Sequence, residues 1–315
     1  MAAPRIIFMG TPDFAGESLR ALIGSNCFQV LAVVCQPDQP AGRGLKLQAP
    51  PTKKIARDQN IPVLQPERAR DENFLRQLRD LQPDVIAVTA YGQILPGSIL
   101  QLPPHGCLNV HASLLPKYRG AAPIQWALLN GDTDTGVTIM KMDAGMDTGA
   151  ILSQEKIPIL AEDNSRTLHD RLSRAGAGLL VKTISEYLEG RVQPRPQPVE
   201  GVVYAPKIQK KDGQIDWHQP ARLIWNRVRA MVPWPGAFTH LQVLQRREFL
   251  KIWASEIADE SGPHGRVIRA DKDGIVVACG SQSLRLLQVQ LEGGRRMSAQ
   301  EFLAGHPLHA GDPVG

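Results

Sequence analysis

The feature that most limits how this chain can fold is the alternation of short apolar runs with helical patterns in its first half. Continuous apolar runs such as RIIFMG (5–10), QVLAVVCQ (29–36) and DVIAVTAYG (84–92) are typical of strands that are buried on both faces. Between them lie amphipathic stretches such as DFAGESLRALIGS (13–25), which are typical of helices that cover a sheet. The alternation predicts an α/β fold with a Rossmann-like, mostly parallel sheet.

The sequence after this alternating half follows a different pattern. One long helix is predicted over 164–190, with Asn164 or Ser165 as its cap and Gly190 at its end. The stretch RVQPRPQPVEG (191–201) has three prolines and is typical of an extended linker. One helix candidate and five short strand candidates follow, and they predict a small OB-like β-barrel. We therefore expect a first domain over 1–189, a linker over 190–207 and a second domain over 208–315.

The charge is spread unevenly along the chain. Residues 1–190 hold 19 basic and 19 acidic side chains, whereas residues 191–315 hold 17 basic and 12 acidic ones, so the whole net charge of +5 lies in the second region. Such an excess points to a polyanionic partner, although a solvated surface with a modest imbalance would give the same count.

Several classes of protein are disfavoured by what the sequence lacks. No run of eighteen apolar residues is present, so no transmembrane helix is expected, and the N-terminus lacks the long apolar core of a signal peptide. The four cysteines form no CxxC pair, and no cysteine and histidine cluster has zinc spacing. We expect reduced, mostly buried thiols, no metal and a cytoplasmic location.

Three polar residues form a candidate site. Asn109 and His111 are two residues apart at the end of the predicted strand LNVH (108–111), so they should point to the same face. Asp147 follows the apolar run GVTIMKM (136–142) in a glycine-bearing loop. An asparagine amide can stabilise an oxyanion, a histidine can carry a proton, and a carboxylate can fix the charge of the imidazole. Together they predict acyl transfer without a covalent nucleophile.

Two stretches, NVHASLLPKYRGAAPIQWALLNGD (109–132) and TGVTIMKMDAGMDTGAIL (135–152), resemble the folate-dependent formyltransferases. With IIFMGTPDFA (6–15), QPDQPAGRG (36–44) and the predicted barrel, the resemblance extends from Arg5 to about Gly305. It implies transfer of a formyl group from 10-formyltetrahydrofolate, as a co-substrate that is not tightly bound, to an amine. Asn109, His111 and Asp147 would be catalytic. The chain looks like the members of this family whose acceptor is methionine esterified to initiator tRNA.

The resemblance also implies where the substrates bind. A folate-binding wall would be formed by Ser113, Leu114, Leu115 and Pro116. Ile94 and Leu95 in AYGQIL (90–95) would line the pterin pocket, although a plain strand-to-helix turn would also explain that stretch. The tRNA would contact the second domain.

A long loop, QPDQPAGRGLKLQAPPTKK (36–54), is a second candidate for tRNA binding. It carries Arg43, Lys46, Lys53 and Lys54 against the single acid Asp38, and Arg43 and Lys46 are the residues that we expect to contact the tRNA. A solvated insertion would explain the loop equally well. Neither a metal nor a membrane is implied, and we expect a monomer.

Two alternatives remain open from the sequence. One keeps the chemistry but changes the acceptor to a small amine, a nucleotide sugar or a glycinamide nucleotide, for which a basic barrel would be unnecessary. The other is an RNA-binding module whose α/β half is inactive, and the intact Asn109, His111 and Asp147 argue against it.

Overall fold

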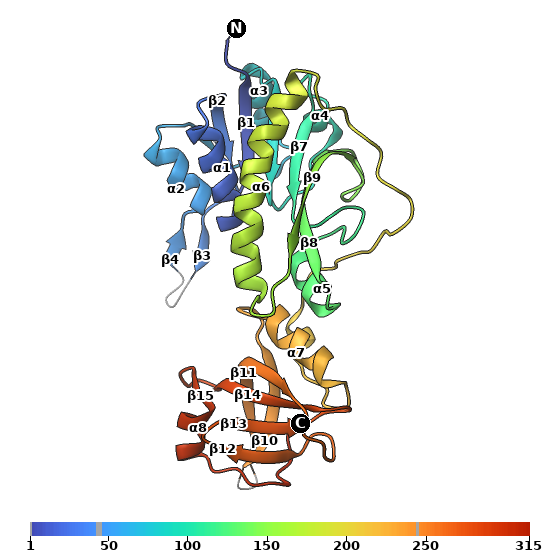
Figure 1. Ribbon diagram of the computed structural model, residues 1–315. Coiled ribbons are helices and arrows are strands. Elements are labelled where there is room, and N and C mark those ends of the chain that lie inside the picture. The colour runs from blue at the N-terminus through green and yellow to red at the C-terminus, as the bar shows by residue number, and fades with distance from the viewer. Residues whose placement is uncertain (1, 42–45, 244–245) are drawn as a thin grey trace. The chain divides into compact units, whose positions relative to one another are not determined.

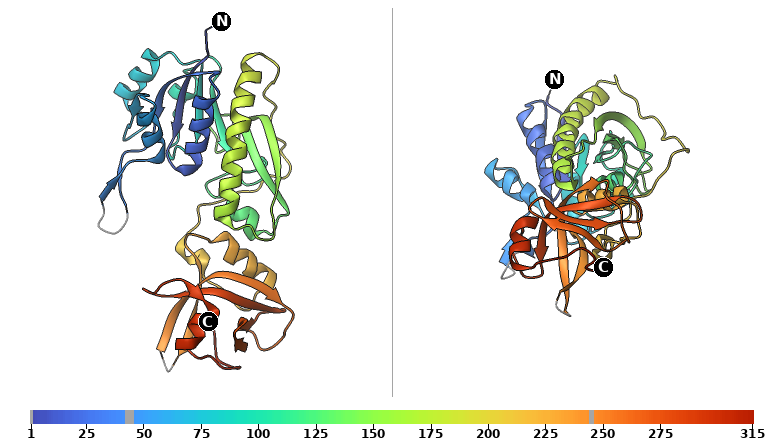
Figure 2. Two further views of the ribbon diagram at one scale, coloured as in Figure 1. Left: turned by 60° about the vertical axis from the view of Figure 1, so that its left-hand side comes forward. Right: turned by 60° about the horizontal axis from the view of Figure 1, so that its bottom comes forward.

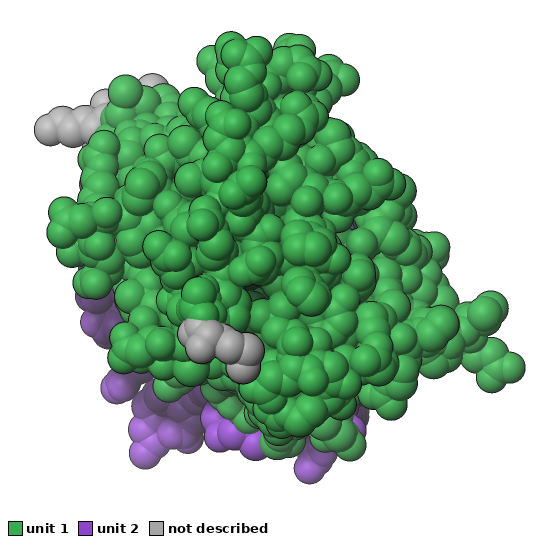
Figure 3. Space-filling model, turned by 90° about the horizontal axis from the view of Figure 1, so that it is seen from above, with its two compact units in different colours: residues 1–123, 134–158, 169–205 green, residues 124–133, 159–168, 206–315 purple. Residues whose placement is uncertain are grey.

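The computed structural model describes residues 2–41, 46–243 and 246–315, and the chain divides into two compact units (Figure 1; Figure 3 colours them separately). Unit 1 consists of Met1–Pro123, Asp134–Pro158 and His169–Ala205. Unit 2 consists of Ile124–Thr133, Ile159–Leu168 and Pro206–Gly315. Two short segments from the part of the sequence predicted as the first domain therefore group with the C-terminal part, and no change in composition marks either of them.

Unit 1 is built on a seven-stranded sheet with the order β5-β2-β1-β6-β7-β8-β9. The parallel strands are β1 (Arg5–Gly10), β2 (Gln29–Val34), β5 (Val63–Leu64), β6 (Val85–Thr89) and β7 (Cys107–His111). The antiparallel strands are β8 (Asp134–Lys141) and β9 (Ala150–Pro158). The predicted mostly parallel sheet is therefore confirmed.

The strand order reverses at β1, because the chain goes from β1 to β2 on one side and returns to β6 on the other. Ligands of open α/β sheets bind beyond the carboxyl ends of the strands at such a reversal. The loops after β1, β6 and β7 leave this edge of the sheet, and the candidate site is at its β7 end.

Helices cover both faces of the sheet (Figure 2). On one face, α3 (Glu72–Asp80) and α4 (Gly97–Leu100) pack on a buried core. That core includes Ile7, Met9, Ile86, Val88, Phe74, Leu78 and Ile99. On the other face, α1 (Asp13–Gly24) and α6 (Ser165–Leu188) lie side by side, because the ring of Phe14 contacts that of His169 with 5.2 Å between centroids. A Cβ atom at Gly176 would lie 2.8 Å from Cγ1 of Val110, so α6 is tightly packed on β7.

The ends of α6 follow the sequence prediction. Oδ1 of Asn164 accepts hydrogen bonds from the backbone N–H groups of Arg166 and Thr167 at 2.9 and 3.1 Å. These bonds satisfy two of the donors that a helix leaves free at its first turn. At the other end Gly190 has φ 76°, a conformation that favours glycine.

The loop at 36–54 contains more structure than the sequence indicates. β3 (Gln39–Ala41) and β4 (Lys46–Gln48) form a small antiparallel hairpin before α2 (Pro51–Asp58). Arg43 and the side chain of Lys46 lie outside the described residues. Lys53 is 7% exposed, and its Nζ lies 2.7 Å from Oδ1 and 2.8 Å from Oδ2 of Asp38. Lys53 is thus paired within the protein and is not an available cation of the loop.

The segment expected to be a linker forms isolated β-bridges with other parts of unit 1. Arg195 forms a β-bridge with Ile151, and Tyr204 forms one with Arg119. We call residues 191–205 the strap. It is the long extended segment that follows α6 in Figure 1.

Unit 2 contains an antiparallel sheet with the order β10-β11-β14-β13-β12, and β15 pairs with β14. Its strands are β10 (Ala237–Val243), β11 (Arg246–Ala258), β12 (Val267–Asp271), β13 (Gly274–Ala278), β14 (Ser283–Leu291) and β15 (Met297–Ser298). Val314 bridges to Leu241 in β10, and Pro313 bridges to Arg266 beside β12. The C-terminal residues thus join the two edges, which closes the predicted barrel.

The helices of unit 2 are α7 (Ala221–Ala230), α8 (Ala299–Gly305), the 3₁₀ turn η1 (Lys210–Gly213) and most of α5 (Pro123–Leu129). The segment 159–168 is tied to α7, because the Arg229 guanidinium donates to the carbonyls of Leu160, Ala161 and Asp163. Within the described ranges, no helix is long and apolar enough to cross a membrane.

Candidate active site

His111 and Asp147 are brought together from different strands. His111 is the last residue of β7, and Asp147 lies in the loop between β8 and β9. Nδ1 of His111 is 3.7 Å from Oδ2 of Asp147, and His111 is 6% exposed. The Nε2 atom of the same ring is 2.9 Å from the carbonyl oxygen of Tyr118. Because a carbonyl can only accept, Nε2 carries a hydrogen and Nδ1 is the nitrogen left to exchange a proton.

Asn109 precedes His111 by two residues on β7 and therefore projects from the same face of the sheet. It is 9% exposed. In the described part of the chain, its side-chain amide makes no hydrogen bond. A nearly buried amide of this kind has both of its N–H groups available for a ligand oxygen.

The loop after β7 is held by side-chain hydrogen bonds, two of which come from buried hydroxyl groups. The hydroxyl of Thr138 in β8 donates to the Ser113 carbonyl at 2.6 Å. The hydroxyl oxygen of Thr138 also accepts from the backbone N–H of Leu115 at 3.2 Å. The side chain of Gln154 donates to the Leu115 carbonyl at 2.9 Å. Ser113 donates its hydroxyl to the Lys117 carbonyl at 2.6 Å.

The four residues expected to bind folate are placed differently within this loop. Leu115 is buried and packs with Met140 and Ile151, so its side chain belongs to the core. Ser113 is fully buried, whereas Leu114 and Pro116 are partly exposed. A cis peptide bond joins Leu115 to Pro116.

The loop after β6 leaves the sheet beside β7, because β6 and β7 are parallel neighbours. Ile94 is 91% exposed, whereas Leu95 is 5% exposed and belongs to the core cluster under α3 and α4. Gln93 anchors the loop, since its Oε1 accepts from the backbone N–H of Ala69 at 2.7 Å. Of the two residues expected to line the pterin pocket, only Ile94 presents its side chain at the surface.

A thiol nucleophile is disfavoured at this site. Cys107 opens β7, but burial raises the pKa of its thiol to about 12. Burial also raises the pKa of Cys35, at the end of β2, to about 11. Both thiols stay protonated at neutral pH, and a thiolate is the reactive form. The amide, imidazole and carboxylate of the site fit acyl transfer to an external nucleophile.

Two residues outside the expected catalytic and substrate-binding sets support the site. Gly120 donates its backbone N–H to Oδ2 of Asp147 at 2.8 Å. Gln197, in the strap, donates to the carbonyls of Asp147 and Gly149 at 2.7 and 2.8 Å. Neither residue lies in a periodic pattern, so only the folded chain reveals these contacts.

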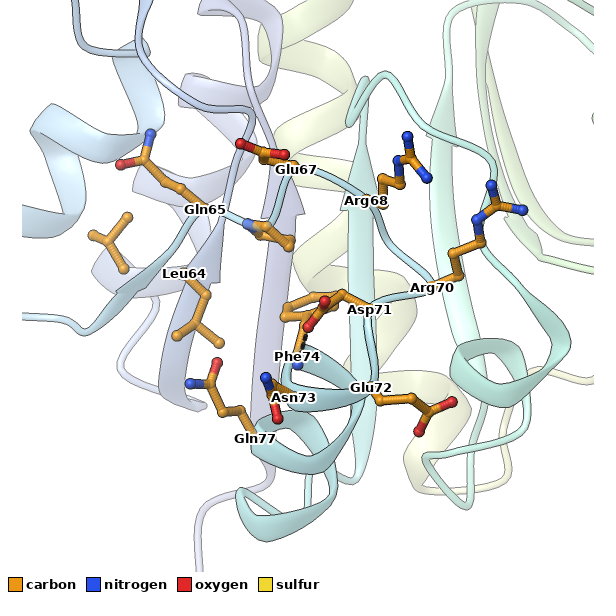
Figure 4. Close-up of a pocket in the computed structure, with 12 residues that line it drawn as sticks. Leu64, Gln65, Glu67, Arg68, Arg70, Asp71, Glu72, Asn73, Phe74 and Gln77 are labelled. Carbon is orange, nitrogen blue, oxygen red and sulfur yellow. Dashed lines mark hydrogen bonds between the residues drawn. The ribbon is translucent and has the colours of Figure 1, made fainter.

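Other hollows of unit 1 lie away from these residues. Figure 4 shows one of about 840 Å³ beside β5 and α3, lined among others by Gln65, Arg70 and Phe74. None of the predicted site residues lines it. Among the described residues, no group of three or more histidine, cysteine or acidic side chains could hold a metal ion.

Comparison with known proteins gives two family matches. Residues 4–184 match the model described as formyl transferase, and residues 207–307 match the model described as formyl transferase, C-terminal domain. The first match spans Asn109, His111 and Asp147, and the second spans nearly the whole barrel.

Curated relatives match along the full chain. A methionyl-tRNA formyltransferase from Geobacter metallireducens is 50% identical over 315 residues, which is 100% of both chains. A protein of the same name from Myxococcus xanthus is 48% identical over 99% of this chain and 98% of its own.

Solved structures share the fold at low identity. An N-formyltransferase from Helicobacter canadensis in complex with folinic acid and dTDP-3-aminofucose has a TM-score of 0.65 at 20% identity, over 90% of this chain and 99% of its own. HypX from Aquifex aeolicus in complex with tetrahydrofolic acid has a TM-score of 0.65 at 15% identity, and this chain spans 51% of its length.

Proposed function

Because this chain belongs to the formyl transferase family, we propose that it transfers the formyl group of 10-formyltetrahydrofolate to the amino group of methionine carried by initiator tRNA. The observation that carries this function is the 50% identity, over the whole of both chains, to a methionyl-tRNA formyltransferase. The product is N-formylmethionyl-tRNA, which serves translation initiation. The formyl donor is a co-substrate that is consumed in each turnover.

The catalytic roles go to Asn109, His111 and Asp147. The neutral amine attacks the formyl carbon, and the carbonyl oxygen becomes an oxyanion of the tetrahedral intermediate. The Asn109 amide has free N–H groups to donate to that oxygen, and removing one such donor typically costs about 3 kcal/mol.

The proton that leaves the amine must reach the folate nitrogen when the bond between that nitrogen and the formyl carbon breaks. Nδ1 of His111 is the exchanging position, since Nε2 is held by the Tyr118 carbonyl. The carboxylate of Asp147, 3.7 Å from Nδ1, favours the imidazolium while it holds the proton.

Binding of the two substrates is assigned to different parts of the chain. Ser113, Leu114, Leu115 and Pro116, with Ile94 and Leu95, form the folate site, and the partly exposed Leu114 and exposed Ile94 offer the apolar surface that a flat ring needs. Unit 2, together with Arg43 and Lys46 from the sequence stretch 36–54, binds the tRNA. Unit 2 itself holds 16 basic and 14 acidic residues, so most of the excess of 17 over 12 after position 190 disappears once 124–133 and 159–168 are counted with it and 191–205 is not.

The domain functions follow from the same assignment: 1–189 is the catalytic domain, 190–207 a connection and 208–315 an OB-like tRNA-binding domain. We place the enzyme in the cytoplasm, where charged tRNA and reduced folates are found, and we expect it to act as a monomer.

One experiment tests the function directly. The protein is incubated with 10-formyltetrahydrofolate and one acceptor at a time: methionyl initiator tRNA, methionyl elongator tRNA, a nucleotide amino sugar or glycinamide nucleotide. Formylation of the initiator tRNA in clear preference to the others is expected. Formylation of only a small amine would reject the tRNA as acceptor, and transfer to none of them would reject the enzyme assignment.

A further inference from the structure

The inference starts from the side-chain amide of Gln197, whose orientation is set by its partners. Arg119 lies on one side and donates to Oε1 from Nε at 3.1 Å and from Nη2 at 2.7 Å. The carbonyls of Asp147 and Gly149 lie on the other side, 2.7 and 2.8 Å from Nε2. A guanidinium can only donate and a carbonyl can only accept. The amide therefore fits in one orientation only, with each of its hydrogen-bonding groups engaged.

The loop that Gln197 holds is under backbone strain. Asp147 has φ 52°, in the left-handed region that residues with a side chain adopt rarely, although aspartate adopts it more readily than most. Such a conformation persists only where the surroundings impose it. Gln197 bonds to the carbonyl of Asp147 itself and to that of Gly149, and so fixes the peptide groups on the carboxyl side of the strained residue.

The same strap also holds the loop that faces Asp147. The Arg119 N–H donates to the Val203 carbonyl at 2.9 Å, and the Ala205 N–H donates to the Arg119 carbonyl at 2.8 Å. A Cβ atom on Gly120 would lie 2.7 Å from the Ala205 carbonyl oxygen, so the strap backbone is in close contact there. The N–H of Gly120 donates to the Asp147 carboxylate, and the neighbouring Tyr118 carbonyl accepts from His111.

We propose that Gln197 is a positioning residue for the reaction, and that through it the strap sets the position of the Asp147 carboxylate beside His111. Gln197 touches no reacting atom. It links the Arg119 loop to the Asp147 loop, so both loops that orient the imidazole and the carboxylate are held by one side chain. This inference rests on the proposed function for its kinetic consequence, whereas its structural consequence can be measured independently.

The kinetic consequence follows from geometry. A displacement of about 1 Å in a reacting group can cost about 100-fold in rate. Release of the Asp147 loop should therefore lower kcat without changing how either substrate is held. We expect kcat to fall between about 10-fold and about 100-fold, with the KM values for the donor and for tRNA within about twofold of the wild type.

Two substitutions isolate the role of the amide. Gln197→Met keeps the length of the side chain and removes its hydrogen bonds. Gln197→Glu keeps an acceptor for Arg119 but places a carboxylate oxygen against two carbonyl oxygens, so it should be at least as damaging. Gln193→Met is the matched control, because Gln193 is an exposed glutamine of the same strap whose amide donates only to the Gly190 carbonyl.

The structural readout is the hydrogen exchange of the Gly120 N–H, which is bonded to the Asp147 carboxylate. Exchange of this amide should be at least about tenfold faster in Gln197→Met and unchanged in Gln193→Met, since loss of the acceptor exposes the donor. The full-length protein is used throughout, and melting temperatures are compared. If the Gln197 variants unfold, Arg119→Lys serves instead, because lysine cannot donate the paired bonds to Oε1, and a smaller loss of kcat with faster Gly120 exchange is expected.

The possible results separate the two proposals. Faster Gly120 exchange together with the selective fall in kcat supports the positioning role. Unchanged exchange in Gln197→Met, or a kcat equal to that of the wild type, overturns it even if the wild-type enzyme formylates tRNA normally. A wild-type protein without formyl transfer would reject the function, and the exchange measurement would still decide whether Gln197 holds the Asp147 loop.

Discussion

At the scale of single residues, the proposed reaction gives three side chains separate tasks. In that proposal Asn109 offers its amide, His111 exchanges a proton through Nδ1, and Asp147, 3.7 Å away, supplies a negative charge. The tasks are not interchangeable, since only the imidazole can both take and give a proton near neutral pH and only the carboxylate carries a negative charge.

Replacement of any of the three by alanine should lower kcat while the fold is retained. We expect a loss of about 100-fold to 1,000-fold for Asn109→Ala, and of about 100-fold to 10,000-fold for His111→Ala and Asp147→Ala. Steady-state kinetics with both substrates saturating measures the effect, and far-UV circular dichroism controls for folding. A variant with near-normal kcat would exclude that residue from the chemistry.

The cysteines should differ sharply in reactivity. Cys27 is exposed, whereas burial raises the pKa of the Cys35 thiol to about 11 and those of Cys107 and Cys279 to about 12. Ellman's reagent at pH 8 should therefore modify one thiol in the native protein and all four in denaturant, because it reacts with accessible thiolates. Cys27→Ser is the control, and any fast-reacting thiol in that variant would show that a buried cysteine is open to solvent.

The sequence predicts the placement of Asn109 and His111 because a strand has a period of two, which is a local rule. It does not predict Gln197 or the neutralised Lys53. Both depend on partners that are distant in the chain, 50 residues from Gln197 to Asp147 and 15 from Lys53 to Asp38. A proline-rich stretch has no periodicity, so nothing in it distinguishes an anchoring glutamine from a solvated one.

At the scale of elements, the apolar runs identify β1, β2, β6, β7 and β8 of unit 1, and capping residues identify the ends of α6. The hairpin of β3 and β4 is missed, because each strand has three residues and lies between prolines and glycines. The strap is missed for a related reason. It joins unit 1 through isolated β-bridges to Ile151 and Arg119. Isolated bridges do not require an alternation of apolar and polar residues, so the sequence shows no strand pattern there.

The N-cap of α6 gives a test at this scale. Asn164→Ala should lower the free energy of unfolding by about 1 kcal/mol, because two backbone N–H groups lose their acceptor. Asn164→Asp should stay close to the wild type, since aspartate also caps and its charge suits the helix N-terminus. Urea unfolding measures the difference, and an alanine variant as stable as the wild type would mean that the cap contributes nothing.

At the scale of the whole molecule, salt should affect the binding of the two substrates differently. If unit 2 and the hairpin bind tRNA through its phosphates, the affinity for tRNA must fall steeply as salt rises, with a log–log slope of about −0.9 for each phosphate contact to a double-stranded region. The KM for the folate donor should change much less. Equilibrium binding of initiator tRNA between 50 and 200 mM KCl, with donor kinetics as the control, measures both quantities, and a tRNA affinity insensitive to salt would contradict phosphate recognition.

The division into two units is the part of the architecture that is hardest to predict from the sequence. The linker-like composition of 191–201 suggests a boundary there, yet contacts assign the chain to unit 1 as far as Ala205 and assign 124–133 and 159–168 to unit 2. These two segments lie within the α/β part of the sequence. They belong to unit 2 because they pack against residues that come much later in the chain.

The strap has a consequence for the time at which a newly made chain becomes competent. A ribosome completes Asn109, His111 and Asp147 well before Gln197, which follows Asp147 by 50 residues. If Gln197 positions Asp147, a nascent chain that has exposed only its first 190 residues carries every reacting group but not the side chain that aligns them. Full catalytic activity would then require that the strap has emerged from the exit tunnel.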